Sequence, residues 1–305
     1  MSRSFRVSLV FGIAVSCLTS LGNASVVAPT LNWDAAEDSS SQHWDSKFNG
    51  AGLNQHNNRR WDFGSNVTAD DASGSNFGAI TKSYDDKATM KSFNSLNFTG
   101  TNPTNQDATF ELVVRPDDLD GGKKTIFETG GNGDGMALYL QDDQLTFRVQ
   151  NFNSGKNAQA EISYTLGAAG RFYDILLTIN VGDADTSLIQ LFVDSTLRAE
   201  GNFYRKNKGP GDEKRALSDW AGGDGAELGW YAGGSEAGGG NGGQFQGDIA
   251  IMRFYQNDIL DQSEIDGNFA ALQAIPEPSS IAMWSALGII GLVVARRKRK
   301  LTRAA

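Results

Sequence analysis

The body of this 305-residue chain is predicted to be all-β, built of short strands that form a sandwich or a barrel. Apolar and polar residues alternate with a period of two in several stretches, which is the pattern of a half-buried strand. Gly, Asn and Asp cluster between these stretches, as the turns of such folds require. The predicted strands are residues 107–116, 136–140, 145–149, 162–166, 173–181, 188–194 and 248–255.

The first of these strands has the clearest alternation. The even-numbered residues from Ala108 to Val114 are apolar and share one face. Glu111 and Arg115 lie on the other face, which makes the strand half-buried. Pro116 ends the strand, because proline cannot donate to a sheet ladder.

The middle of the chain contains a predicted hairpin and a buried strand. Residues 136–140 and 145–149 are joined by the acidic turn Asp142-Asp143. In residues 173–181 the alternation is broken by Leu176, which is also apolar, so this strand is expected to be covered on both faces.

One segment near the end of the body reads as a helix. Asp261 can cap it, and Glu264 stands three residues later, as in a capping box. Leu260, Ile265, Phe269 and Leu272 then follow at roughly helical spacing. A short helix closing a set of strands is a common arrangement.

Three stretches taken in order resemble the laminin-G-like or concanavalin A-like jelly roll, a sandwich of two antiparallel sheets. They are residues 110–116, 189–194 and 245–255, the last running into 260–272. The chain departs from that family in two places. Ser195 stands where the strand-ending "YVDG" has Gly, and Arg171-Phe172-Tyr173 stands in place of "WHH". The domain is predicted to span residues 25–273.

The resemblance implies a carbohydrate or protein ligand, often with a calcium ion. Calcium needs six to eight oxygen ligands, which Asp, Asn and backbone carbonyls supply. Asp118 and Asp120 in one stretch, and Asn132 and Asp134 in another, are the candidate ligands. Asp-Gly pairs are also common turn residues, and neither stretch matches an EF-hand loop. No cofactor other than calcium is implied.

Two tryptophans are candidate sugar-stacking residues. Trp220 and Trp230 lie among many glycines, which favours an exposed loop where an indole can stack on a sugar ring. The alternative is that they belong to the core, where tryptophan is also common. The glycine run at residues 238–243 fits the dinucleotide fingerprint by letter only, because it precedes a predicted strand and not a helix.

No catalytic residues are predicted. The acidic "ExDxE" pattern of glycosidases on this scaffold is missing, and His43 and His56 are the only histidines. The GxSxG of a serine hydrolase is also missing. A glycoside hydrolase remains the alternative, because two acids can meet across strands.

The N-terminus reads as a secretory signal over residues 1–24. Arg3 and Arg6 precede an apolar run, and Gly22-Asn23-Ala24 predicts cleavage between Ala24 and Ser25. The only cysteine is Cys17, so a chain cleaved there forms no disulfide. In a second interpretation Cys17 is the lipid-bearing residue of a lipoprotein.

The domain between the two ends is strongly acidic. Residues 25–275 hold 19 of the 27 basic and 35 of the 36 acidic residues, a net charge of −16. A negative charge of this size repels nucleic acid and anionic lipid. Cations and neutral polymers are the partners that it favours.

The C-terminal residues 274–305 form a predicted membrane anchor. Pro276-Glu277-Pro278 precedes an apolar segment, predicted as a transmembrane helix over residues 279–295. A basic stop over residues 296–303 holds the end on one side of the inner membrane. Its core is Arg296, Arg297, Lys298, Arg299 and Lys300.

This order of parts resembles the PEP-CTERM sorting tail of bacterial envelope and exported proteins. The resemblance implies an exosortase as partner, a membrane transpeptidase that cleaves near Pro-Glu-Pro and releases or reattaches the body. The chain is therefore predicted to be an exported, non-catalytic surface or matrix protein that binds polysaccharide or has a structural role. A simple tethered protein without processing is the alternative to sorting.

Overall fold

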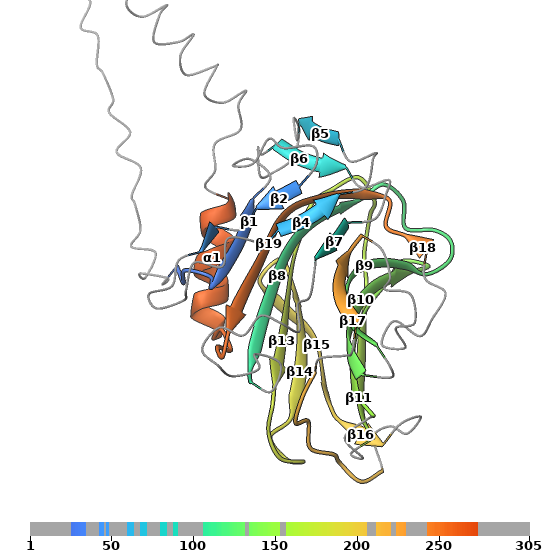
Figure 1. Cartoon of the computed structure of the whole chain (residues 1–305), viewed down its shortest axis with the longest axis vertical. Helices are drawn as coiled ribbons and strands as arrows, with labels where there is room; N and C mark the ends of the chain where they lie inside the picture. The colour runs from blue at the N-terminus through green and yellow to red at the C-terminus, as the bar shows by residue number, and fades with distance from the viewer. Residues whose placement is uncertain are drawn as a thin grey trace, which may run out of the picture.

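The structure, a computed structural model, describes thirteen stretches between residues 26 and 273. Within them the chain forms two β-sheets packed face to face and one α-helix on the outer side of one sheet (Figure 1). The prediction of an all-β sandwich is thereby confirmed. The described residues are 26–34, 43–45, 47–48, 60–63, 68–71, 80–83, 88–90, 106–131, 134–152, 157–205, 212–220, 224–229 and 243–273.

Sheet A has nine strands, which all pair antiparallel. They are β1 (Leu31–Asp34), β3 (Lys47–Phe48), β5 (Thr68–Asp71), β6 (Ile80–Ser83), β8 (Ala108–Pro116), β13 (Tyr173–Asn180), β14 (Leu188–Val193), β15 (Thr196–Asn202) and β19 (Gly247–Gln256). The order is β15-β14-β13-β8-β19-β1-β3, with β6 beside β19 and β5 beside β6. The last strand, β19, therefore lies between an early strand and β8, as in a jelly roll.

Sheet B has ten strands, and only β18 pairs parallel to its neighbour, β9. They are β2 (His43–Asp45), β4 (Arg60–Phe63), β7 (Ala88–Met90), β9 (Lys124–Gly131), β10 (Asp134–Gln141), β11 (Gln144–Asn151), β12 (Ala158–Thr165), β16 (Tyr204–Arg205), β17 (Asp224–Leu228) and β18 (Gly243–Gln244). The main order is β16-β12-β11-β10-β9-β17-β7-β4-β2.

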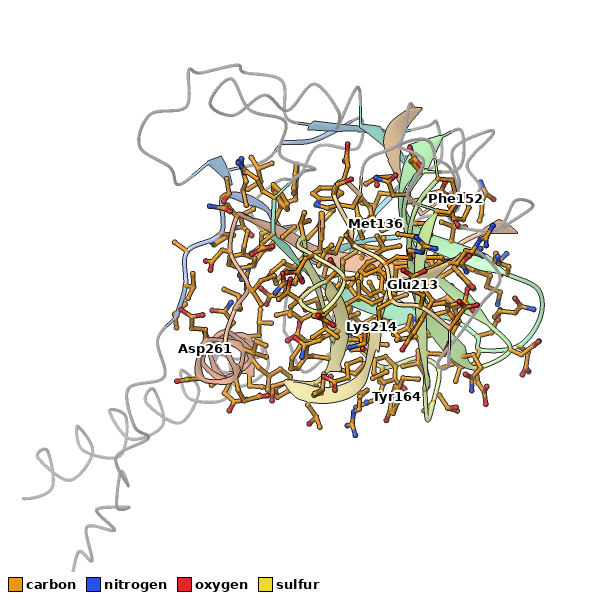
Figure 2. The ribbon with its side chains drawn as sticks, turned by 90° about the horizontal axis from the view of Figure 1, so that it is seen from below. Met136, Phe152, Tyr164, Glu213, Lys214 and Asp261 are labelled. Carbon is orange, nitrogen blue, oxygen red and sulfur yellow. The ribbon has the colours of Figure 1, made fainter. Side chains whose placement is uncertain are left out.

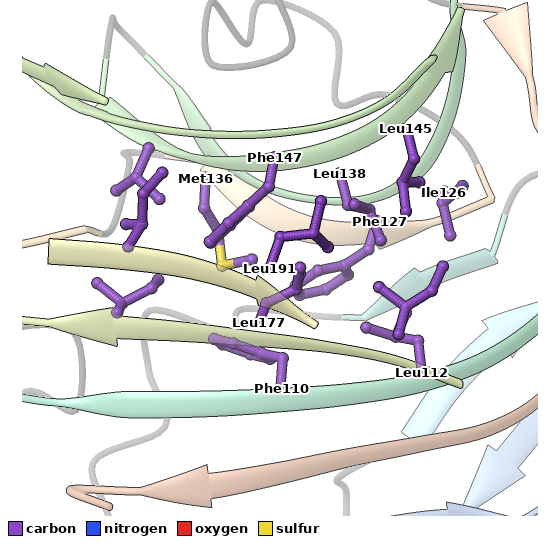
Figure 3. Packing of buried hydrophobic residues seen from close by; sticks show 14 of the residues in the cluster. Phe110, Leu112, Ile126, Phe127, Met136, Leu138, Leu145, Phe147, Leu177 and Leu191 are labelled. Carbon is purple, nitrogen blue, oxygen red and sulfur yellow. The ribbon is translucent and has the colours of Figure 1, made fainter. Parts of the chain in front are cut away.

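The main core lies between the two sheets (Figure 3). Phe110 of β8 is at its centre, with ring centroids 5.4 Å from Phe127 of β9 and 5.0 Å from Phe254 of β19. Met136, Leu138, Leu145 and Phe147 reach into this space from β10 and β11. The apolar face predicted for residues 108–114 is thus a core face, because each of its members is fully buried.

The other face of β8 is also buried, which corrects the half-buried prediction. Glu111 and Val113 are 0% exposed. Helix α1 (Gln262–Gln273) packs on this outer side of sheet A, where Leu272 joins the cluster around Val113 (Figure 1). The prediction that β13 is covered on both faces is confirmed, because Leu176 packs there beside Ile265.

The predicted capping box of the helix is confirmed. The Glu264 amide donates to Asp261 Oδ1, and the Asp261 amide donates to Glu264 Oε2, both at 2.9 Å. Two amides that lack helical partners are thereby satisfied. In Figure 2, which looks along α1, Asp261 lies on the far side of the sandwich from Met136 of sheet B.

A buried polar network joins this helix to sheet A. Glu111 accepts from the Arg253 guanidinium at 2.9 Å and from the Tyr255 hydroxyl at 2.7 Å. Asn268 of α1 donates to that hydroxyl at 2.8 Å and accepts from the Val27 amide at 3.1 Å. Burial, and then the Glu111 carboxylate, raise the pKa of Tyr255, so the phenol stays a neutral donor. The helix and the N-terminal segment are therefore held by one chain of hydrogen bonds.

Asp174, beside this network on β13, gives the fold a dependence on pH. Burial and then Glu111 raise the pKa of its carboxyl well above the ordinary value, against the effect of Arg253. The protonated form is therefore favoured in the folded chain, and ionisation costs stability as the pH rises above about 4, the unfolded value. We expect D174N to remove this loss. Between pH 4 and pH 8 the free energy of unfolding of the variant, measured with urea, should therefore increase relative to that of the wild type. A constant difference across that range would contradict a titrating Asp174.

Two hairpin turns use residues with positive φ. Asp142 and Asp143 have φ of 51° and 53° and join β10 to β11, which confirms the predicted hairpin. Asp194 and Ser195 have φ of 52° and 58° and join β14 to β15. Both loops have the two positive φ angles of a type I′ turn, which favours Gly at the second position.

S195G is expected to raise the free energy of unfolding by about 0.5–1 kcal/mol, because glycine adopts positive φ without the steric cost of a side chain. The contact that the turn makes with α1 is preserved, since Gln262 donates to the backbone carbonyl of residue 195 at 2.8 Å. T196G, one residue later on the exposed strand, is the matched control and should destabilise. Urea unfolding of the two variants measures both effects, and a loss of stability in S195G would contradict the expectation.

The predicted signal and tail lie outside the described residues, as do Ala24, Ser25 and Pro276-Glu277-Pro278. The transmembrane prediction at residues 279–295 and the basic stop also fall there. Among the residues that are described, α1 is neither long nor apolar enough to cross a bilayer.

Candidate functional site

The outer face of sheet B is the candidate site, because polar side chains gather there. On β9, β10 and β11, Phe127, Leu138 and Phe147 point into the core, so their neighbours Glu128, Ala137 and Arg148 lie on the opposite face. These strands bow toward the core in Figure 3, and their outer side is concave. We call this surface the outer face of sheet B.

Small residues occupy the middle of this face. Ala137 lies between Arg148 and Glu128 in the register, and Gly135 lies between Gln150 and Gly130. Long polar side chains therefore stand on either side of a strip of backbone. Ala137 and Gln150 are nevertheless 0% exposed, so the middle of this strip is covered.

A cation and an aromatic ring form one part of the face. The Lys123 ammonium lies 4.1 Å from the ring centroid of Tyr139, which is a cation–π contact. Burial, and then Arg148, lower the pKa of Lys123, while Glu161 and Glu128 oppose this. Burial and then Glu161 raise the pKa of Tyr139. Tyr139 is thus a neutral phenol whose ring already has a cation beside it.

Four residues of β11 and β12 form a second part, which we call the outer-face quartet: Arg148, Gln150, Gln159 and Glu161. Arg148 is the register partner of Glu161, and Gln150 of Gln159. Arg148 Nε lies 3.6 Å from Glu161 Oε2, with side-chain exposures of 16% and 43%. Gln150 is 0% exposed. The quartet is therefore closed at its inner corner and open toward the edge of the sheet.

Acidic positions recur along one row of the strand register. Glu128, a fully buried carboxylate, pairs in register with Glu227 of β17. Thr89 of β7, Asp62 of β4 and His43 of β2 continue the row from strand to strand. Sequence reasoning found none of these acids as a group, because they come from separate strands.

The family follows from the sequence match. The laminin G family model, described as the concanavalin A-like lectin/glucanases superfamily, matches residues 90–266. The chain belongs to this concanavalin A-like superfamily. A search of curated proteins gives no match.

Solved structures of similar fold are receptor-binding domains. The botulinum neurotoxin serotype D binding domain is 11% identical with a TM-score of 0.52, over 80% of this chain and 50% of that one. A second structure, of the receptor binding domain of botulinum neurotoxin D, is 11% identical with a TM-score of 0.52, over 80% of this chain and 52% of that one. The binding domain of botulinum neurotoxin serotype D/C is 12% identical with a TM-score of 0.50, over 81% of this chain and 52% of that one. This chain spans about half the length of those chains, and the likeness shows the fold alone.

For Trp220 the alternative of a core position is confirmed, and its candidacy as an exposed sugar-stacking residue is wrong. In this concanavalin A-like fold Trp220 is 0% exposed. Its indole N–H donates to the Gln106 carbonyl at 2.9 Å, and its ring lies edge-on to Phe110 at 5.5 Å. The glycines near it in sequence do not decide its burial, since Leu217 and Trp220 of residues 212–220 both belong to the main core. Trp230 lies outside the described residues.

The two stretches proposed for calcium lie at opposite ends of β9, and no described residues form a group of three potential metal ligands among His, Cys, Asp and Glu. Asp118 is paired with Lys124, and Asp120 is exposed. Asp134 is buried and accepts a hydrogen bond from the Phe152 amide. Asn132 lies outside the described residues. The described carboxylates therefore serve the hairpins, and calcium at either stretch gains no support.

Proposed function

We propose that this chain is an exported, non-catalytic protein of the cell surface or extracellular matrix that binds polysaccharide through the outer face of sheet B. The observation that carries the proposal is the hydrogen-bonding capacity of this face. The side chains described there include two positive charges, Lys123 and Arg148, and two negative ones, Glu128 and Glu161. Neutral sugar polymers present many hydroxyls and no charge, which suits a surface of this kind.

Sorting by an exosortase is the second part of the proposal. The Pro276-Glu277-Pro278, apolar and basic segments would hold the chain in the inner membrane until cleavage. The described ends support this arrangement, because the Val27 amide bonds to Asn268 of α1 on the outer side of sheet A. Both described ends therefore lie on the side of the sandwich opposite the outer face of sheet B, so a membrane anchor at either end would lie away from that face.

Two experiments test these parts separately. Retention of the mature protein on immobilised polysaccharides tests the binding part, and a lack of retention on every polymer leaves only a structural role. Mass spectrometry of the exported protein tests the sorting part. A C-terminus that still ends at Ala305 contradicts cleavage and favours a simple tether.

A glycoside hydrolase is the second candidate, favoured by the pairing of Glu128 with Glu227. Directly opposed positions in adjacent strands place Cβ atoms about 4.5–5.5 Å apart. Retaining glycosidases need two carboxyl groups about 5–5.5 Å apart. Reducing-sugar release by the wild type, and its loss in E128Q and E227Q, would support catalysis. Binding without any release in the wild type would exclude it for the polymers tested.

A further inference from the structure

The loop that joins β8 to β9 contains an aspartate followed by two glycines, Asp120-Gly121-Gly122, and all three residues are exposed. A Cβ atom added at Gly121 or Gly122 would meet nothing within 4 Å. Gly121 has a φ of 100°, which glycine adopts without steric cost. The peptide bond after Asp120 therefore lies in open space at the surface.

The two groups that flank this bond are free, although the chain on either side is held. Within the described chain, the Asp120 carboxylate makes no hydrogen bond or ion pair, and the Gly121 amide donates to no carbonyl. The Asp143 amide, by contrast, donates to the Leu119 carbonyl at 2.9 Å, and the Asp142 amide donates to the Gly121 carbonyl at 3.3 Å. The loop is thus attached to the β10–β11 turn through the residues before and after Asp120.

We propose that Asp120-Gly121 is a site of spontaneous modification, at which the aspartate becomes isoaspartate through a succinimide. The Gly121 nitrogen attacks Cγ of the protonated Asp120 carboxyl. A C–N bond forms and a C–O bond breaks, and the hydroxyl leaves as water with the amide proton. Water then adds to a carbonyl of the ring, and opening on the main-chain side gives isoaspartate. The step needs no enzyme, oxidant or reductant, and it is independent of polysaccharide binding.

The nitrogen of a glycine suits this attack, because no side chain on its own residue hinders the approach. Ring closure also requires the peptide unit after the aspartate to turn toward the carboxyl. A peptide whose N–H and C=O are bonded in a helix or a sheet ladder cannot turn without losing those bonds. The free Gly121 amide has no such bond to lose within the described chain.

Three other Asp-Gly pairs provide a comparison inside the same chain. They are Asp134-Gly135 in β10, Asp224-Gly225 in β17 and Asp266-Gly267 in α1. The Asp134 side chain accepts a hydrogen bond from the Phe152 amide, and Gly135 lies between two neighbouring strands. Gly267 is buried in the helix. The fold therefore holds the other three pairs in regular structure and leaves only Asp120-Gly121, of the described pairs, in a loop.

Isoaspartate at this place would change the end of the sandwich. The main chain then runs through the former side chain, which lengthens it by one atom between the carbonyls of Leu119 and Gly121. Those two carbonyls accept from the amides of Asp142 and Asp143. Loss of these bonds should raise hydrogen exchange at the two amides about tenfold, the effect of roughly one hydrogen bond each.

Ageing of the folded protein tests the site. The mature protein is kept for weeks in mildly acidic buffer at growth temperature and then digested with an endoproteinase that cleaves before aspartate but not before isoaspartate. Peptide mass spectrometry should show isoaspartate at residue 120 at least about tenfold faster than at 134, 224 or 266, because those sites must first open locally. In urea all four pairs should convert at comparable rates.

Two variants complete the test. D120E should abolish conversion at residue 120 and keep the exchange of Asp142 and Asp143 constant during ageing, because a glutamate would have to close a six-membered ring, which is slower. D117E is the matched control, since Asp117 is exposed on the same loop but precedes no glycine, and it should leave conversion unchanged. Absence of isoaspartate at residue 120, or equal conversion of all four pairs in the folded protein, would overturn the proposal.

Discussion

E111A is expected to lower the free energy of unfolding by about 3–5 kcal/mol, the usual effect of breaking a buried ion pair from one side. The Glu111 side chain is 0% exposed, and its partner Arg253 is 18% exposed. Removing the carboxylate leaves the guanidinium without its 2.9 Å counter-charge and the Tyr255 hydroxyl without its acceptor. Chemical unfolding at neutral pH measures the loss.

Two further variants separate charge from packing. E161A removes a carboxylate that is 43% exposed and 3.6 Å from Arg148, so it should change stability by less than about 1 kcal/mol. The double variant E111M/R253M removes both charges and should recover most of the loss, since apolar residues can replace a buried ion pair. A double variant as unstable as E111A would show that lost volume, and not the unpaired charge, is the cause.

The effect of E111A on amide hydrogen exchange should differ between parts of the chain. Asn268 of α1 and the Val27 amide depend on the Tyr255 hydroxyl that Glu111 orients. Amide exchange in E111A should therefore increase first in α1 and in residues 26–34, and later in β10 and β11. Uniform exchange across both sheets would mean that the network does not specifically hold the two chain ends.

Sequence patterns correctly predicted the structural features that depend on residues close together in the sequence. The alternation of β8, the positive-φ turn of the β10–β11 hairpin and the capping box at Asp261 each depend on residues close in sequence. By contrast β9 was missed, because its polar and apolar residues alternate only in part around a bulge between β9 and β10. Strands β1 to β7 and β15 to β18 were missed as well, most of them because they are short, and β15 because it is polar and mostly exposed.

The candidate site depends on register, which sequence alone does not give. Glu128 and Glu227 are almost a hundred residues apart and meet only because β17 pairs with β9. The quartet likewise needs the pairing of β11 with β12. Composition pointed instead to Trp220, since glycine-rich surroundings are typical of exposed loops. The burial of a residue is decided by which strands its loop crosses, and no local pattern contains that information.

W220A is expected to lower the free energy of unfolding by about 3–5 kcal/mol, because it removes a large core side chain and leaves a cavity. Trp220 packs edge-on to Phe110 at 5.5 Å and to Phe254 at 6.4 Å, at the centre of the core. Its indole N–H also bonds to the Gln106 carbonyl. Thermal or urea unfolding measures the effect, and W220F should lose less because it keeps most of the aromatic volume.

W220A also distinguishes between a core role and a sugar-stacking role for Trp220. A tryptophan that stacks on a ligand from a loop would cost affinity when removed and change stability by no more than about 0.5 kcal/mol. The buried position predicts the reverse, a large loss of stability with polysaccharide affinity unchanged in the fraction that remains folded. Unfolding curves therefore have to be measured before binding, because at a loss of 3–5 kcal/mol an unfolded fraction would imitate a binding defect. Added neutral polymer should raise the midpoints of wild type and W220A by similar amounts, since a ligand that binds only the folded state stabilises it by mass action. A shift in the wild type alone would place Trp220 at the ligand after all.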